Sequence, residues 1–291
     1  MGAERSEHRM VDVGEVRLHV VEAGRAKERP LVVLLHGFPE FWWSWRHQIP
    51  ALAAAGFHVV VPDMRGFHLS DAPRRVSAYR MDRLESDVAG LIGAMGKSRA
   101  MIVGHDWGAM VAWSFAQHFP EMVARLAILN VPHPERTAGA LRSLKQLRKS
   151  SYILFFQLPW LPEWWLSKGD FKSLRRLFEI DGMGRAEVDR YVEAIEKGGL
   201  RGLNYYRAWI RGLALGRIPK PVRIEAQALV IWGKKDRFIG EELAAPDARW
   251  VPHARVEYIE HASHWVQHDA PERVNELLLA FATAPGWPAA P

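Results

Sequence analysis

The chain has 291 residues, of which 48% are hydrophobic and 25% charged, a balance typical of one large globular domain or of a domain with a sizeable insertion. It contains no cysteine, which excludes a disulfide framework and thiolate chemistry. The formal net charge is +6, but no recognised nucleic-acid motif accompanies this charge, so we expect no nucleic-acid partner.

The first residues, MGAERSEHRM, are polar and lack the apolar stretch of a signal peptide. No run of the chain reaches the roughly 18 consecutive apolar residues that a membrane-spanning helix needs. We therefore expect a cytoplasmic protein without stable membrane insertion.

Short apolar runs alternate with helical stretches along most of the chain. Residues 11–20 alternate apolar and polar side chains around Gly14 and predict a hairpin. Five continuous apolar runs predict buried strands, at 31–37, 58–63, 100–106, 126–130 and 228–233. Helices are expected between and after them, at about 43–55, 82–96, 107–118 and 271–282. This order predicts an α/β fold with a mostly parallel sheet and helices on both faces.

The segment from 133 to 222 interrupts that alternation. It has helical periodicity without strand-like runs, and it carries 17 Lys and Arg against 9 Asp and Glu. We predict that it forms a helical cap, or lid, inserted into a core domain made of residues 1–132 and 223–291. A solvated helical surface is the plainest interpretation of its charge.

The sequence GHDWGA, residues 104–109, places Asp106 where a strand-to-helix elbow of the G-x-S-x-G type carries a serine nucleophile. Gly104 and Gly108 flank it, as a tight and crowded turn requires. These features predict that Asp106 is a nucleophile. The alternative is an aspartate that only caps the following helix.

HGFPE, residues 36–40, follows the predicted strand 31–37, where this architecture places a second oxyanion-hole donor. We expect the backbone N–H groups of Phe38 and Trp107 to form that hole. A simple strand-ending turn is the alternative for this motif.

Two further residues complete a candidate catalytic triad. Asp236 follows the strand predicted at 228–233, and His264 precedes the last predicted helix. Nucleophile, acid and histidine follow one another as in hydrolases with this elbow, so His264 is the expected base and Asp236 its partner. Neighbouring histidines show no metal-ligand spacing, and we expect no metal and no cofactor.

The chain resembles the α/β-hydrolase superfamily, and within it the epoxide hydrolases of the bacterial type. The resemblance rests on HGFPEFWWSWRHQIP, PDMRGFHLSDAP, GHDWGA, SYILFFQ, LNYYR, GKKD and SHWVQHDAPERVN, which span nearly the whole chain. It implies the same roles for Asp106, Asp236 and His264, and it adds two ring-polarising tyrosines, Tyr152 and Tyr206. Phe67 departs from the tyrosine that relatives often carry, and we expect this change to affect packing more than chemistry.

A carboxylate at the elbow favours alkyl transfer, because its attack on a carboxylic ester would give only an anhydride. An epoxide oxygen leaves as a basic alkoxide and needs a proton donor, a role that suits Tyr152 and Tyr206. Because adjacent helical residues point about 100° apart, only one of Tyr205 and Tyr206 can face the nucleophile, and the resemblance favours Tyr206. We therefore predict hydrolysis of epoxides to vicinal diols. A haloalkane dehalogenase with the same nucleophile, and a non-catalytic small-molecule receptor on the same fold, are the alternatives.

The substrate pocket is expected to be lined by His36, Pro39, Trp107, Phe156 and Trp265. Aromatic walls favour small apolar or aryl epoxides, with water as the second substrate. The tryptophans of LPWLPEWWL, residues 158–166, either line the pocket entrance or touch an anionic membrane surface beside the basic cap. A second copy of the chain, in a homodimer, is a further candidate partner.

Overall fold

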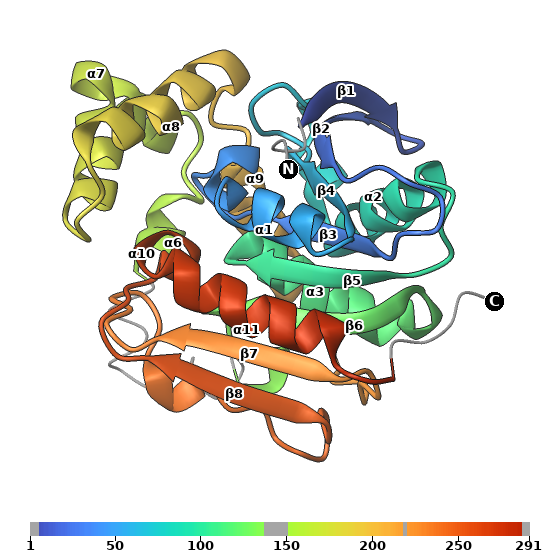
Figure 1. Cartoon of the computed structure of the whole chain (residues 1–291). Helices are drawn as coiled ribbons and strands as arrows, with labels where there is room; N and C mark the ends of the chain where they lie inside the picture. The colour runs from blue at the N-terminus through green and yellow to red at the C-terminus, as the bar shows by residue number, and fades with distance from the viewer. Residues whose placement is uncertain (1–5, 137–150, 218–219, 287–291) are drawn as a thin grey trace.

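The computed structural model describes residues 6–136, 151–217 and 220–286. Its centre is an eight-stranded sheet with the strand order β1-β2-β4-β3-β5-β6-β7-β8 (Figure 1). The strands are β1 (Glu7–Asp12), β2 (Arg17–Ala23), β3 (Leu31–Leu35), β4 (His58–Pro62), β5 (Ala100–His105), β6 (Val123–Leu129), β7 (Ala228–Gly233) and β8 (Ala254–Ile259).

The strands of the sheet are mostly parallel. β1 pairs antiparallel with β2, and β2 pairs antiparallel with β4, whereas every pair from β4 to β8 is parallel. The predicted hairpin and the five predicted strands are therefore confirmed. Parallel strands place their carboxyl ends at one edge, and ligand sites of open α/β sheets form at that edge.

Two helical layers cover the sheet. Alternate residues of β3 face opposite sides, since Val32 and Leu34 belong to one hydrophobic cluster and Val33 and Leu35 to another. The first cluster includes side chains of α1 (Gln48–Ala54) and α11 (Pro271–Thr283). The second includes side chains of α2 (Met81–Ala94) and α3 (Trp107–His118). Both faces are buried, which explains why these strands are continuous apolar runs.

Two elements differ from the expectation. The helix expected over 43–55 is divided into a 3₁₀ turn, η1 (Trp42–Trp45), and α1. Strand β8 is not among the predicted strands, because its sequence ARVEYI carries charged residues and only its last residue is buried. It is the last strand of the sheet, and most of its side chains stay partly or fully exposed, so they need not be apolar.

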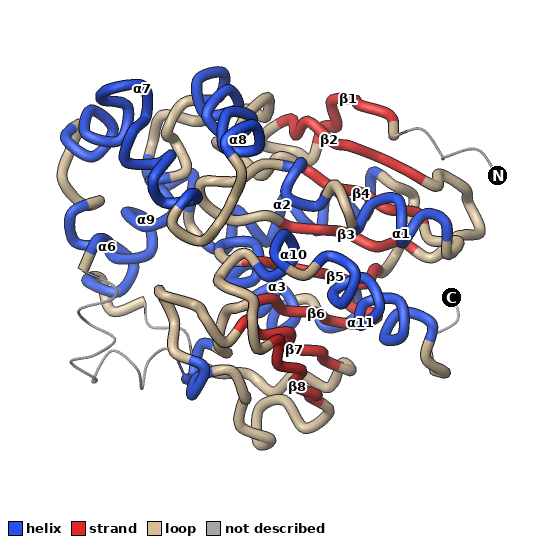
Figure 2. Tube along the Cα trace, turned by 60° about the vertical axis from the view of Figure 1, so that its left-hand side comes forward, coloured by secondary structure: helices blue, strands red, loops and turns tan. Residues whose placement is uncertain are grey.

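The described elements between β6 and β7 are all helical. They are α6 (Tyr152–Phe155), α7 (Leu161–Glu179), α8 (Arg185–Gly198) and α9 (Leu203–Ala214). Figure 2 shows them gathered beyond one end of the strands. The proposed limits of the cap, 133 and 222, are not tested, and part of that segment lies outside the described residues. Within the described residues, no helix is long and apolar enough to cross a membrane.

Close packing brings α9 onto the loop after β3. A Cβ atom on Gly202, directly before α9, would come within 2.5 Å of the Phe67 ring and 3.0 Å of the Phe38 ring. Only glycine at position 202 therefore allows α9 to approach the Phe38 and Phe67 rings so closely. Phe67 packs between His36 and Tyr205, in agreement with the packing role expected for it.

Candidate active site

The turn that carries Asp106 joins β5 to α3. Asp106 has φ 48° and ψ −121°, in a region that L residues rarely adopt, so its backbone is strained. A Cβ atom on Gly108 would overlap the carbonyl group of Leu35, and one on Gly104 would come within 2.5 Å of the Gly108 carbonyl oxygen. The two glycines thus permit the sharp turn that the motif predicts.

The Asp106 carboxylate lies between a backbone amide and an imidazole. Phe38 donates its backbone N–H to Asp106 Oδ1 at 2.7 Å, and His264 Nε2 lies 3.7 Å from Asp106 Oδ2. Burial alone would raise the pKa of Asp106, but His264, His105 and the Phe38 amide hold that pKa below its ordinary value. The carboxylate is therefore ionised at neutral pH. The Asp106 side chain keeps 18% of its surface exposed, which leaves room for a small molecule to approach the carboxylate.

Trp107 is the first residue of α3. The N–H groups of a first helical turn have no partner within the helix, so the Trp107 amide can bind an oxygen at the helix start. The second amide, on Phe38, is already directed at Asp106. The two amides predicted to form an oxyanion hole thus come from two loops, one after β3 and one after β5, which meet at the elbow.

The other side of the site is formed by His264 and Asp236. His264 Nδ1 lies 2.7 Å from Asp236 Oδ2, and both side chains are buried. Burial by itself would lower the pKa of His264, but the charges of Asp236 and Asp106 raise that pKa well above its ordinary value. The imidazole is consequently held as a cation while both carboxylates are charged.

Asn130, which sequence reasoning missed, orients the acid. It follows β6 with φ 53°, donates its side-chain amide to Asp236 Oδ2 at 2.8 Å, and accepts the Gly233 N–H at 2.9 Å. Asp236 Oδ1 accepts the backbone N–H groups of Phe238 and Ile239. An asparagine at the end of a buried strand was the only signal available in the sequence.

A buried polar brace connects the three loops of the site. His105 Nδ1 lies 2.7 Å from Glu40 Oε2, and His105 Nε2 lies 2.8 Å from the backbone oxygen of His264. Glu40 also accepts the Gly37 N–H at 3.0 Å and the Gln267 side-chain amide at 3.0 Å. Burial would raise the pKa of Glu40, but His105 brings that pKa below its usual value. Apart from the polar residues inside the motifs, nothing in the sequence indicated this brace.

His36 supports the loop after β3. It is fully buried, its Nδ1 lies 2.9 Å from the Gly37 carbonyl oxygen, and its Nε2 accepts the Met64 N–H at 2.9 Å. Burial lowers its pKa, so the ring is neutral. Both ring nitrogens are engaged with backbone, and its predicted place in the pocket stays a prediction.

Tyr152 and Tyr206 meet in the described part of the cap. Their rings contact edge to face with centroids 6.0 Å apart, and the Tyr206 ring also packs against Trp107 at 4.9 Å and Phe38 at 5.7 Å. Burial, together with the Asp106 charge, raises the pKa of both hydroxyl groups above the ordinary value. Both tyrosines therefore keep their protons.

The neighbouring Tyr205 has a different environment. Its hydroxyl group donates to the backbone oxygen of Arg65 at 3.0 Å, and its ring packs against Tyr79 and Phe67. Tyr205 thus anchors α9 to the core.

The three remaining residues predicted to line the pocket are all buried. Phe156 is buried and packs against Phe38, Tyr152 and Tyr206. Pro39 is buried and follows a cis peptide bond from Phe38. Trp265 is buried against His264, His105 and Phe178. Their contact with a substrate stays a prediction.

The tryptophans of the LPWLPEWWL stretch face outward. Trp160, Trp164 and Trp165 are 72%, 52% and 46% exposed, so they lie on the surface of the cap. Lys168 lies over the Trp164 ring, with Nζ 4.9 Å from its centroid.

The chain is similar to known proteins in sequence and fold. The family model described as alpha/beta hydrolase fold matches residues 30–271. The AB hydrolase superfamily protein YfhM of Bacillus subtilis is 39% identical over 93% of this chain and 96% of its own length. Human epoxide hydrolase 4 is 39% identical over 94% of this chain and 77% of its own. The crystal structure of Bacillus megaterium epoxide hydrolase with an inhibitor matches with a TM-score of 0.87 at 31% identity, covering 95% and 100% of the two chains.

Proposed function

The chain belongs to the α/β-hydrolase family and within it to the epoxide hydrolases, and from this premise we propose that it converts epoxides to vicinal diols through a covalent ester on Asp106. The observation that carries the proposal is the Asp106 carboxylate between the Phe38 amide and His264. The proposed steps use these groups, the Trp107 amide, the two tyrosines and water.

In the first step, Asp106 Oδ2 attacks a carbon of the epoxide ring, and the bond from that carbon to the ring oxygen breaks. This assignment follows from the contacts of the carboxylate, because Oδ1 is already engaged by the Phe38 amide. A tyrosine gives its proton to the departing oxygen, and the product is a hydroxyalkyl ester of Asp106. Tyr152 and Tyr206 suit this role because their raised pKa values keep them protonated until an alkoxide forms.

The second step uses the change of charge that the first step produces. Once Asp106 is an ester, its negative charge no longer stabilises the His264 cation, so the pKa of His264 falls and the proton that His264 gives up restores the tyrosine hydroxyl group that the first step deprotonated. The neutral imidazole is then a base. His264 then takes a proton from water as the water attacks Asp106 Cγ. The oxyanion forms on Oδ1, facing the Phe38 and Trp107 amides, and each such donor contributes about 3 kcal/mol in other hydrolases. Collapse of this oxyanion breaks the bond between Cγ and the diol oxygen, and the departing oxygen takes the proton of the newly added hydroxyl group. The Asp106 carboxylate and the His264 cation are thereby restored.

The aromatic environment supports an apolar or aryl epoxide as the substrate. The rings of Phe38, Trp107, Phe156, Tyr152 and Tyr206 contact one another around the carboxylate. We further propose that residues 133–222 act as the cap that supplies both tyrosines, on a core of residues 1–132 and 223–291. Within this assignment, the enclosure of the epoxide keeps bulk water from competing for the alkoxide.

The reaction is tested by offering the purified protein styrene oxide and a 1-bromoalkane side by side. We expect diol from the epoxide, because the two tyrosines can protonate the ring oxygen as it leaves. We expect no bromide release, because a halide needs no proton donor and a site built around two tyrosines suits an oxygen leaving group instead. Chromatography of the diol and ion chromatography of bromide measure the two products. Bromide without diol would contradict the proposal in favour of a dehalogenase. Failure of both substrates and of a wider epoxide panel would favour a receptor.

Removal of the tyrosine hydroxyl groups is expected to slow formation of the ester. The double variant Tyr152→Phe, Tyr206→Phe should lower kcat for styrene oxide by about 10²–10⁴-fold, the range for loss of a general acid. Each single variant should lose less, because the remaining tyrosine still donates. Initial rates of diol formation measure the effect.

Tyr205→Phe is the matched control, since it removes the same atom from the adjacent residue of α9. Its hydroxyl group binds the Arg65 carbonyl group, so we expect kcat close to that of the parent and a loss of about 1 kcal/mol in the free energy of unfolding. An equal loss of kcat in Tyr205→Phe and Tyr206→Phe would show that the hydroxyl groups act only through packing.

A further inference from the structure

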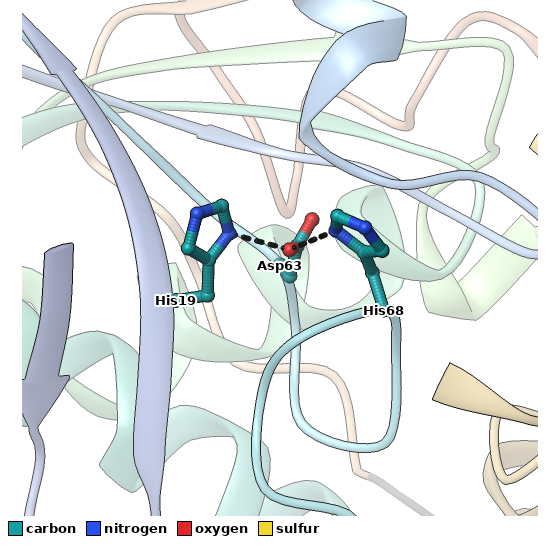
Figure 3. Close-up of side chains that lie close together, drawn as sticks. All are labelled: His19, Asp63 and His68. Atoms are coloured by element: carbon teal, nitrogen blue, oxygen red, sulfur yellow. Dashed lines mark hydrogen bonds and ion pairs between the residues drawn. The ribbon is translucent and has the colours of Figure 1, made fainter. Parts of the chain in front are cut away.

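A second cluster of imidazole and carboxylate groups involves none of the proposed catalytic residues. His19 lies on β2, Asp63 directly follows β4, and His68 lies in the loop after it. Figure 3 shows both imidazole rings directed at the one carboxylate. His19 Nδ1 lies 2.6 Å and His68 Nδ1 2.8 Å from Asp63 Oδ2, and the three atoms all lie within 4.8 Å of one another.

The carboxylate at the centre is rigid and charged. Asp63 is fully buried, and its Oδ1 accepts the Trp42 N–H at 2.9 Å, which leaves Oδ2 to the two imidazoles. The Ser70 hydroxyl group accepts the backbone N–H of His19 and donates to the Asp63 carbonyl oxygen. It therefore links the backbone of β2 to the residue that follows β4. Burial alone would raise the pKa of Asp63, but the hydrogen bonds from His19 and His68 bring that pKa to about 2.

His8 is placed to control the tautomer of His19. His8 Nδ1 lies 3.1 Å from His19 Nε2, on the far side of the ring from Asp63. When the proton of His19 sits on Nε2 and is donated to His8, the lone pair of His19 Nδ1 is free. An outer partner of this kind accompanies most histidines that bind metal ions. His8 is exposed, so the cluster lies just beneath the surface of the protein.

The backbone of His68 gives an independent indication. Its φ is 42°, in the left-handed region that glycine adopts without strain and residues with a Cβ atom avoid. A strained backbone at a polar site points to a role for the side chain that it presents. The side chain presented here is an imidazole that is only 10% exposed and directed at Asp63.

We propose that His19, Asp63 and His68 bind a divalent transition-metal ion such as Zn²⁺, with His8 holding His19 in the ligating tautomer. Two imidazole nitrogens and one carboxylate oxygen form a known zinc ligand set, in which water takes the fourth position. At bond lengths of about 2.0–2.1 Å and tetrahedral angles, ligand atoms lie about 3.3 Å apart. The His19 and His68 N···O distances of 2.6 and 2.8 Å therefore need to open by about 0.7 and 0.5 Å as the ion replaces the shared protons. The bound ion ties β2 to the loop after β4.

Calorimetric titration of the whole, metal-free chain with ZnCl₂ tests this proposal. We expect one tightly bound ion per chain in the parent protein. His68→Gly should weaken Zn²⁺ binding at least about 10-fold, and glycine suits the backbone conformation at this position. His8→Ala should weaken it about 10–100-fold, the range for loss of an outer partner. His253→Gln, which removes an exposed histidine on a distant part of the sequence, should bind as the parent does.

Thermal unfolding supplies a second measurement. Zn²⁺ should raise the Tm of the parent and of His253→Gln, because an ion that binds only the folded chain stabilises it, and it should leave the Tm of His68→Gly nearly unchanged. Circular dichroism checks that His68→Gly is folded. If it is not, the Zn²⁺ affinity of His8→Ala tests the proposal in its place. Equal affinity in the parent, His68→Gly and His8→Ala would overturn the proposal, as would the absence of saturable binding. Neither readout depends on epoxide hydrolysis.

Discussion

Asp106→Asn is expected to lower the turnover of styrene oxide by at least about 10⁴-fold, as loss of a nucleophile does in other hydrolases. An amide has no anionic oxygen to attack the ring, while its shape preserves the acceptor for the Phe38 N–H. Diol formation over a long incubation measures the residual rate. The loss should appear in kcat, because the apolar contacts that bind the substrate remain.

The identity of the Asp106→Asn variant must be checked during this measurement. Intact mass spectrometry excludes hydrolysis of the introduced amide back to a carboxylate, which would restore activity slowly. Binding of a diol product, followed by tryptophan fluorescence, should survive the substitution and serves as the folding control. Turnover close to that of the parent, with the amide intact, would rule out the covalent mechanism.

His264→Gln is expected to stop the second step while the first one continues. Its kcat should also fall by at least about 10⁴-fold, because no base remains to activate water for attack on the ester. The Asp106 ester should then accumulate. Since ester formation adds the epoxide without loss of atoms, the mass of the chain should rise by the mass of one epoxide molecule.

Mass spectrometry of His264→Gln after incubation with styrene oxide measures this adduct, and peptide mapping should assign it to Asp106. His261→Gln is the control, because it removes an exposed histidine from the same loop. It should turn over like the parent and show no adduct. An inactive His264→Gln variant without any adduct would mean that His264 is needed before the ester forms, contrary to the proposed order.

Local patterns in the sequence determined most of the fold. The apolar runs became strands because both faces of the sheet are covered, and α3 begins and ends at the predicted residues, Trp107 and His118. The elbow could also be predicted from the local sequence, because Gly104, Asp106 and Gly108 lie close together along the chain. Strand β8 escaped prediction because an edge strand with Arg255 and Glu257 has no continuous apolar run.

The sequence by itself also predicted the candidate triad, because its three residues stand in short motifs in a known order along the chain, and the family resemblance of those motifs added Tyr152 and Tyr206. Only the tertiary structure decided how these groups are held. Asn130 and the Glu40–His105 brace join residues 65 to 106 positions apart, and the cluster of His19 and Asp63 joins residues 44 apart. A hydrogen bond across such a separation leaves no periodicity in the sequence. It forms because the sheet brings strand ends that are distant along the chain to one edge, and the chain must fold before these partners meet.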